Sequence, residues 1–172
     1  MSERFTIRRA TPGDIEALIE LRLDMQRELV DGEMEVDWTA VQEACRQYFT
    51  EALPAEQFLV FVAEAEGRII ATSGLSFVSR PPSGTSFSRS EGYVTNMYTV
   101  PAWCGRGVAT ALLRATMEHA RHQGARLVYL HTSDAGRSVY EKLGFAENPR
   151  YMQLNLEGPR SKEPGEGTLE QA

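Results

Sequence analysis

The residues best suited to bind a charged ligand lie in the stretch 91–115. An extended segment runs through Pro101, a turn follows that contains Gly105 and Gly107, and an amphipathic run typical of a helix begins there. The first N–H groups of a helix have no partner inside it, and they point outward from the positive end of the helix dipole. This arrangement predicts an anion site at the turn, most often one for phosphate.

Two common nucleotide-binding motifs do not fit this turn. A dinucleotide-binding fingerprint needs a third glycine three residues after the second, and Thr110 occupies that place. It also needs an acid near the end of the next strand, whereas residues 127–132 contain none and Asp134 lies beyond them. A P-loop needs four residues between its glycines and then Lys-Ser or Lys-Thr, and neither feature is present. A phosphate site of another kind and an ordinary glycine turn both remain open.

The turn and its flanks resemble the acyl-CoA-binding segment of the GNAT superfamily, the Gcn5-related N-acetyltransferases. That segment has a strand ending in Tyr-Val-x-Pro or similar, a Gln/Arg-x-x-Gly-x-Gly/Ala turn and a helix with paired leucines. The residues that carry the resemblance are Tyr98, Val100, Pro101, Cys104, Gly105, Arg106, Gly107, Val108, Ala109, Leu112 and Leu113. A second family motif is matched from Ser133 to Phe145, with Tyr140 and the Gly144-Phe145 pair at the family's spacing. Two motifs in the right order identify the chain as a member of this superfamily.

The resemblance implies acetyl-CoA as the cosubstrate and assigns its parts to residues. Backbone groups of four residues are expected to pair with the pantetheine arm like an added strand: Met97, Tyr98, Thr99 and Val100. N–H groups of the turn and the helix start are expected to hold the pyrophosphate: Gly105, Arg106, Gly107, Val108, Ala109 and Thr110. Ser133 stands where the family often has Asn, and it is expected to bond the pantetheine amide.

Cys104 departs from the family pattern, which has Arg or Gln at this place. In the family the long side chain helps to hold the turn or the pyrophosphate, so a lower cofactor affinity is one expected consequence. The backbone donors need no side chain, and Arg106 keeps a cation in the turn. A sharper hypothesis gives Cys104 a depressed pKa and a reactive thiolate, because it lies near a helix N-terminus beside Arg106. The simpler interpretation is a small residue tolerated in a turn.

Acetyl transfer to an amine needs a neutral amine, an oxyanion stabiliser and a proton for the departing thiolate. Tyr140 matches the family's tyrosine general acid, and a phenol with a pKa of about 10 is protonated at pH 7. The alternative is a helix residue whose ring packs on the core. Glu91, at the start of the central strand, is the candidate general base, with Asn96 as an orienting group. A structural or catalytic His131 and a water-assisted reaction without a dedicated base are also open.

The acidic segment between the first two predicted helices bears on the acceptor, because the family lines its acceptor site there. It contains Asp31, Glu33, Glu35 and Asp37. Acids at a cleft mouth favour cationic amines such as polyamines, aminoglycosides or lysine-like groups. A solvated acidic loop is the equal alternative. The predicted acceptor is therefore an amine of a small molecule or a peptide.

Composition and charge narrow the partners. A chain of 172 residues predicts one domain, and a net charge of −6 without a basic run argues against nonspecific binding to nucleic acid or anionic membranes. The two cysteines, Cys45 and Cys104, have no ligand spacing, so neither a disulfide framework nor a metal site is expected. With no leader and no apolar run near the ~20 residues that span a bilayer, the cytoplasm is the expected location. A homodimer is left open.

The elements that must position these residues follow from periodicity and turn signals. We expect strands over 4–9, 58–64, 68–78, 126–132 and 146–156, with a break near 148–149 in the last one, and a central strand from 91. We expect a first helix that starts at Thr11-Pro12 and stops near 31–32, and further helices over 38–53, 136–143 and from the turn to about 123. This order predicts an α/β domain with helices on both faces of a single mixed sheet. It matches the mostly antiparallel acyl-CoA N-acyltransferase fold that the resemblance implies, in which the central strand and the next one splay apart. The domain is placed at 1–156, and the charged tail 157–172 is expected to be disordered.

Three functions are compatible with these residues. The first is an N-acetyltransferase, the second a noncatalytic acyl-CoA-binding or sensing domain, and the third an interaction protein that shares only the fold. Cys104 and the uncertain base favour the second. Tyr140 and two otherwise complete motifs favour the first.

Overall fold

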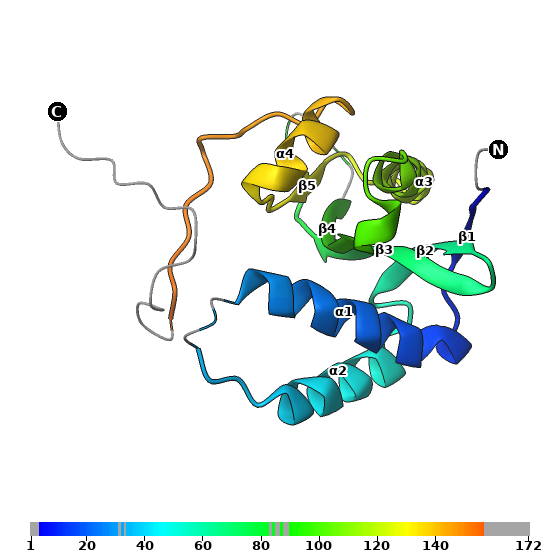
Figure 1. Ribbon diagram of the computed structural model, residues 1–172. Coiled ribbons are helices and arrows are strands. Elements are labelled where there is room, and N and C mark those ends of the chain that lie inside the picture. The colour runs from blue at the N-terminus through cyan, green and yellow to red at the C-terminus, as the bar shows by residue number, and fades with distance from the viewer. Residues whose placement is uncertain are drawn as a thin grey trace, which may run out of the picture.

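A computed structural model shows the chain folded around one five-stranded sheet (Figure 1). The structure describes residues 4–30, 32, 34–82, 84, 87 and 90–156. The strands are β1 (Thr6–Arg9), β2 (Leu59–Ala65), β3 (Arg68–Ser79), β4 (Ser90–Thr99) and β5 (Val128–Leu130). The helices are α1 (Ile15–Leu29), α2 (Trp38–Ala52), α3 (Val108–His122) and α4 (Asp134–Glu141). A short 3-10 helix follows β1 at Pro12–Asp14, and another follows β4 at Pro101–Trp103.

The sheet has the order β1-β2-β3-β4-β5. The first three neighbouring pairs are antiparallel, and β4 and β5 run parallel. Helices α1 and α2 cover one face of the sheet, and α3 covers the other, with α4 beside it (Figure 1). This confirms the predicted fold class of a mixed, mostly antiparallel sheet with helices on both faces.

Strand β2 shows why the sheet needs helices on both sides. Val60 and Val62 pack into the cluster under α1 and α2, which also holds Leu18, Ile19, Phe49 and Phe58. Phe61 and Ala63 point the other way, into the cluster with Val108 and Leu112 of α3. A strand that is buried on both faces reads as a continuous apolar run, as this one does, because neither face meets water.

A bulge interrupts the pairing between β3 and β4. Gly74 pairs with Thr95, yet Thr72 already pairs with Tyr98, so Asn96 and Met97 together oppose a single residue of β3. Asn96 adopts a left-handed φ of 54° at this point, which asparagine tolerates better than most residues. The Thr72 hydroxyl fixes the bulge by donating to the Asn96 carbonyl at 2.8 Å. A bulge of this kind re-aims the side chains that follow it.

The predicted strand over 146–156 is wrong. A turn at residues 149–150 redirects the chain, and the Arg150 N–H is held by the Asn148 side-chain oxygen at 3.1 Å. Beyond it the backbone joins no sheet, and Met152, Leu154 and Leu156 are exposed. Tyr151 packs back onto the sheet, stacked on Tyr129 of β5 with 6.0 Å between ring centroids. Alternating apolar residues therefore did not suffice to build a strand without a ladder partner.

The bounds of β5 and α4 also differ from those expected. Strand β5 is only Val128–Leu130, shorter than the predicted 126–132, and α4 begins at Asp134 rather than at 136. The earlier start follows from Ser133, which caps the helix. The predicted disorder of 157–172 falls outside the described residues. None of the helices in the described ranges combines the length and apolar character needed to cross a bilayer.

Substitution of Gly74 by Ala should destabilise the fold through the bulge. A Cβ at this position would overlap the Phe58 ring and lie 3.0 Å from the Thr95 carbonyl oxygen, so either the core or β4 must shift. We expect a loss of about 1–3 kcal/mol in the free energy of unfolding, measured by urea denaturation. Gly13→Ala is the matched control, since its Cβ would meet only Thr11 at 3.6 Å. Equal effects of the two substitutions would contradict the close approach at Gly74.

Candidate functional site

One edge of β4 is open toward its carboxyl end. Strand β5 pairs with β4 only at Gly92, Tyr93 and Val94, while β4 itself continues to Thr99. Within the described ranges, no strand pairs with this edge of β4 after Val94. This open edge is compatible with the separation of the two strands that the family resemblance implies.

The direction of the backbone groups follows from one hydrogen bond. The Val100 N–H donates to the Ile70 carbonyl at 2.9 Å, so the backbone of Val100 faces β3. In an antiparallel pair this direction alternates along the strand, which turns Tyr98 toward β3 and leaves Met97 and Thr99 facing the open edge. Of the four residues predicted to pair with a pantetheine arm, only Met97 and Thr99 therefore present their N–H and C=O groups outward.

The turn before α3 has the features expected of an anion site. Gly105 and Gly107 adopt left-handed φ values of 75° and 80°, and a Cβ on either would meet nothing within 4 Å. Gly107 is the N-cap of α3 and has no side chain to occupy the first N–H groups of the helix. Because Val108, Ala109 and Thr110 form that first turn, their N–H groups lack carbonyl partners inside the helix. The turn therefore combines backbone donors at the helix start with open space beside its two glycines.

The two side chains flanking the turn are held by neighbours. The Arg106 guanidinium lies over the Trp103 ring, 5.0 Å from its centroid, which keeps the cation beside the turn. The exposed Cys104 thiol donates weakly to the Thr99 and Val100 carbonyls, with sulfur–oxygen distances of 3.5 and 3.7 Å. This geometry favours the interpretation of Cys104 as a small residue that closes the turn. The reactive-thiolate hypothesis gains no support from its contacts.

Tyr140 lies on α4 with its ring in the core cluster under α3 and α4. The ring packs edge-to-face on Phe145, with 5.9 Å between centroids, and Met97 packs against the same cluster. Burial raises the pKa of the Tyr140 phenol, so the hydroxyl keeps its proton at neutral pH. Gly136 makes room for the ring, since a Cβ there would lie 3.2 Å from it. The predicted alternatives of packed residue and general acid are thus compatible with each other.

Ser133 sits at the N-cap of α4, between β5 and Tyr140. Its hydroxyl oxygen accepts from the Gly136 N–H at 3.4 Å, so the oxygen serves the helix. The hydroxyl proton is not used in this bond, so it can still be donated to another group. Ser133 can therefore cap α4 and donate to a ligand at once.

Glu91 is placed at the beginning of β4, away from the open edge. Its side chain is 4% exposed, and its two oxygens accept from Arg80 at 3.0 Å and from Arg126 at 2.6 Å. Six residues separate it from Met97, which corresponds to roughly 20 Å along a strand. This placement does not favour the base role predicted for Glu91 and gives it instead a structural role, which joins two arginines to the sheet.

The remaining predicted groups are distributed around the site. The His131 Nδ1 shares a hydrogen bond of 3.1 Å with the Tyr93 hydroxyl, which engages one of the two ring nitrogens. Asp37 caps α2 by accepting from the N–H groups of Thr39 and Ala40, so this acid of the predicted cluster already has a structural task. Glu35 is exposed, and the predicted Asp31 and Glu33 lie outside the described residues.

Two residues of α1 that the sequence analysis did not single out, Arg22 and Glu28, contact β4 on its α1 face. The Tyr98 hydroxyl donates to Glu28 of α1 at 2.6 Å, and burial together with this carboxylate strongly raises the pKa of Tyr98. Asn96 is 6% exposed, and its side-chain oxygen accepts from Arg22 of α1 at 3.4 Å. Arg22 lies in the middle of α1 and Glu28 near its end, and their partners on β4 face them because of the bulge, which is invisible in the sequence.

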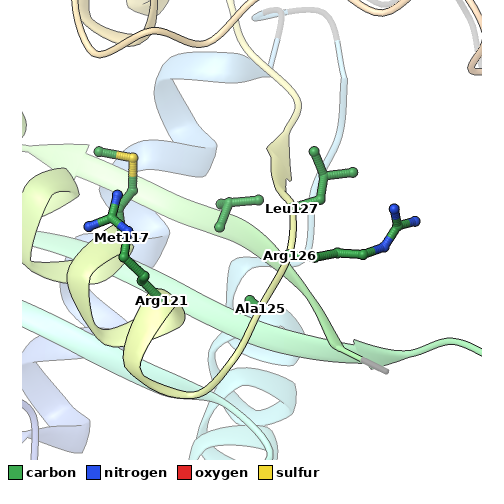
Figure 2. A pocket seen from close by; sticks show the side chains of 6 residues that line it. Met117, Arg121, Ala125, Arg126 and Leu127 are labelled. Atoms are coloured by element: carbon green, nitrogen blue, oxygen red, sulfur yellow. The ribbon is translucent and has the colours of Figure 1, made fainter. Parts of the chain in front are cut away.

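A pocket lies on another part of the molecule, away from the open edge of β4 and the glycine turn. Figure 2 shows it between the C-terminal half of α3 and the start of β5, lined by Met117, Arg121, Ala125, Arg126, Leu127 and Val128. It lies at the opposite end of α3 from the glycine turn. Arg126 is already paired with Glu91, so the pocket offers no group that the chemistry above needs. In the described part of the chain no three His, Cys, Asp or Glu residues gather as a metal site would require.

Comparison with known proteins gives a consistent family. A family model described as "Acetyltransferase (GNAT) family" matches residues 19–145. Glucosamine 6-phosphate N-acetyltransferase of Trypanosoma brucei brucei is 32% identical over 97 residues, which are 56% of this chain and 64% of that protein. Aminoglycoside N(6')-acetyltransferase type 1 of Stenotrophomonas maltophilia is 26% identical over 160 residues, 88% of this chain and 94% of that protein.

A solved structure agrees over nearly the whole chain. The crystal structure of a predicted acetyltransferase with acetyl-CoA from Clostridium acetobutylicum has a TM-score of 0.79 and 28% identity, and covers 92% of this chain and 100% of that one. The chain covers only part of the first three curated relatives that it matches, namely 64%, 42% and 47% of their lengths.

Glu91→Gln should separate a structural role from a catalytic one. The amide keeps the shape but removes the charge, and it sets an N–H group against one of the two guanidinium groups. We expect a loss of about 1–3 kcal/mol in the free energy of unfolding, measured by urea denaturation. Glu118→Gln, on an exposed side chain of α3, should leave stability unchanged. Full stability of Glu91→Gln with a large loss of activity would instead restore the base role.

Proposed function

The chain belongs to the acetyltransferase (GNAT) family, and on that premise we propose that it transfers an acetyl group from acetyl-CoA directly to a primary amine of a small molecule or peptide. The observation that carries the proposal is the open edge of β4, which is followed by a glycine turn with open space beside it at the start of α3. A strand edge followed by an anion site suits a pantetheine arm followed by a pyrophosphate. The catalytic domain is proposed to be 1–156.

The cofactor would be held mainly by backbone groups. Met97 and Thr99 would pair with the amides of the pantetheine arm, as a strand pairs with a neighbour. The N–H groups of the turn would bind the pyrophosphate: Gly105, Arg106, Gly107, Val108, Ala109 and Thr110. The Ser133 hydroxyl would donate to a carbonyl of the arm from the other side of the gap. A site of this kind tolerates Cys104, because none of these contacts uses the side chain at that position.

The proposed transfer needs one side-chain acid, and water takes up the proton of the amine. The neutral amine attacks the thioester carbon, a C–N bond forms, and the C–S bond breaks with its electron pair going to sulfur. The Tyr140 phenol would donate its proton to the departing thiolate, and its raised pKa keeps that proton in place until the thiolate forms. The proton of the amine would leave to water, since Glu91 is paired with two arginines.

The alternative function is a noncatalytic acyl-CoA-binding or sensing domain with the same fold. The engagement of Glu91 and the presence of Cys104 in place of Arg or Gln favour it. Calorimetric titration with acetyl-CoA, run beside an assay of CoA release on a panel of amines, decides between the two. Binding without release on any amine would support the sensing domain.

The acceptor class is narrowed by the relatives only in general terms. Two of them are named for amino sugars, glucosamine 6-phosphate and aminoglycosides, which supports an amine of a small molecule here. The cytoplasmic location, the absence of nucleic-acid and membrane partners, the absence of a metal and the open question of a homodimer remain predictions from the sequence.

Gly107→Ala should weaken acetyl-CoA binding. The new Cβ would enter the open space beside the turn, where the pyrophosphate is proposed to lie, and would also strain a left-handed backbone. Loss of one or two hydrogen bonds to a charged group corresponds to about tenfold or more in Kd, measured by calorimetry. Gly124→Ala is a matched control at the other end of α3, with a φ of 78° and equally open space. Equal losses of affinity in both variants would contradict the site.

Tyr140→Phe should slow the transfer but spare acetyl-CoA binding. Removal of a general acid lowers kcat by about 100-fold or more, whereas the ring still fills the core. The measurement is kcat on a good amine together with the Kd of acetyl-CoA. Tyr129→Phe removes a hydroxyl from a neighbouring tyrosine on β5 and serves as the control. Transfer at the wild-type rate by Tyr140→Phe would refute the acid assignment.

A further inference from the structure

One side chain on the α1 face of β4 has a buried hydrogen-bond donor without an acceptor in the described part of the chain. Asn96 is 6% exposed, its side-chain oxygen accepts from Arg22, and its Nδ2 has no partner among the described residues. Because the oxygen is the end that faces the guanidinium, the donor end of the amide is left over. A buried donor without an acceptor carries a free-energy penalty that a bound oxygen atom would relieve.

Arg22 leaves a positive charge beside this donor. It is half-buried, and within the described ranges no carboxylate forms an ion pair with it. Arg27, on the same helix, is by contrast neutralised by Asp24 at 3.3 Å. Among the described residues, Arg22 donates one N–H to the Asn96 oxygen and carries a charge without a carboxylate partner, and the Asn96 Nδ2 has no acceptor, so the pair matches a ligand group with several negatively charged oxygens.

The position of this pair relates it to the acceptor amine. Asn96 immediately precedes Met97, which begins the backbone run proposed to hold the pantetheine arm. Its side chain lies on the α1 face, as does that of Tyr98, whose hydroxyl is bound to Glu28. The face therefore offers one carboxylate for an ammonium group as well as two donors for an oxyanion.

We propose that Arg22 and Asn96 bind a carboxylate or phosphate group carried by the acceptor amine. This inference rests on the proposed function, and it names the acceptor class as an amine that also bears an oxyanion. It departs from the expectation of simple polyamines, which have no group for these donors. The bulge at Asn96 is what turns the amide toward α1, so the same feature that shapes the strand end would select the acceptor.

The test uses the full chain, labelled with ¹⁵N and saturated with free CoA. Four amines are titrated in two pairs, lysine against cadaverine and O-phosphoethanolamine against ethanolamine. We expect the Asn96 side-chain NH₂ and Arg22 Nε–H signals to shift with lysine or O-phosphoethanolamine and not with the partner that lacks the oxyanion. The two pairs distinguish a carboxylate from a phosphate. The same preference, tenfold or more in kcat/KM, is expected in CoA release on whichever pair is acetylated.

Matched substitutions connect the signals to the two side chains. Asn96→Asp keeps the shape and the left-handed conformation but replaces the donor with an acceptor, and Arg22→Gln removes the charge. Each should weaken binding of the oxyanion probe at least fivefold, while Arg27→Gln on the same helix should leave it unchanged. Should Asn96→Asp fail to fold, Arg22→Gln alone carries the comparison, since its side chain is on the helix surface.

Three results would overturn the proposal. The signals could respond equally to both members of each pair, could respond to none of the four amines, or could shift fully on addition of CoA alone, which would assign the donors to the cofactor. Failure of CoA to bind, with the signals still shifting for the oxyanion probes, would refute the proposed function and leave the oxyanion site standing. The two failures are therefore distinguishable.

Discussion

The bulge in β4 is the constraint on which the arrangement of the site depends. It places two residues of β4 opposite one of β3, and the Thr72 hydroxyl and the close approach of Gly74 to Phe58 hold it in place. Without it, strict alternation would put Asn96 on the same face as Val94, which packs under α3. With it, Asn96 turns to α1, and Met97 returns to the α3 side. One extra residue therefore decides which side chains of β4 meet α1 and which pack under α3.

The short parallel pairing of β4 with β5 leaves one backbone edge of β4 open toward its carboxyl end. On one side β3 pairs with β4 along most of its length, with the bulge as the interruption, whereas β5 covers the other side only to Val94. An open strand edge in the middle of a sheet is a liability unless something pairs with it. In this chain the open edge is followed, after a short 3-10 helix, by the glycine turn at the N-terminus of α3.

Much of this could be predicted from the sequence because it depends on local chemistry. Gly107 marks a left-handed N-cap, and Thr11-Pro12 and Asp37 mark helix starts; each signal lies next to the structure that it determines. Glu91 could not be interpreted in the same way, since its partners Arg80 and Arg126 come from distant positions. The contacts of Arg22 and Glu28 depend on the bulge, which no periodicity reveals. The segment 146–156 has the alternation of a strand, but alternation specifies a face and not a partner.

The charge of the chain explains why the site is built from fixed donors. Acetyl-CoA is strongly anionic, and the chain carries a net charge of −6, so long-range attraction does not favour their association. At physiological salt such forces are largely screened beyond about 8 Å. Binding must then come from short contacts, and in the proposed site backbone N–H groups at a helix start would supply them without ordering long side chains. Arg106, held on Trp103, adds a cation beside the turn. A cofactor site of this kind depends little on the residue at position 104, which is why the replacement of Arg or Gln by Cys104 is compatible with binding.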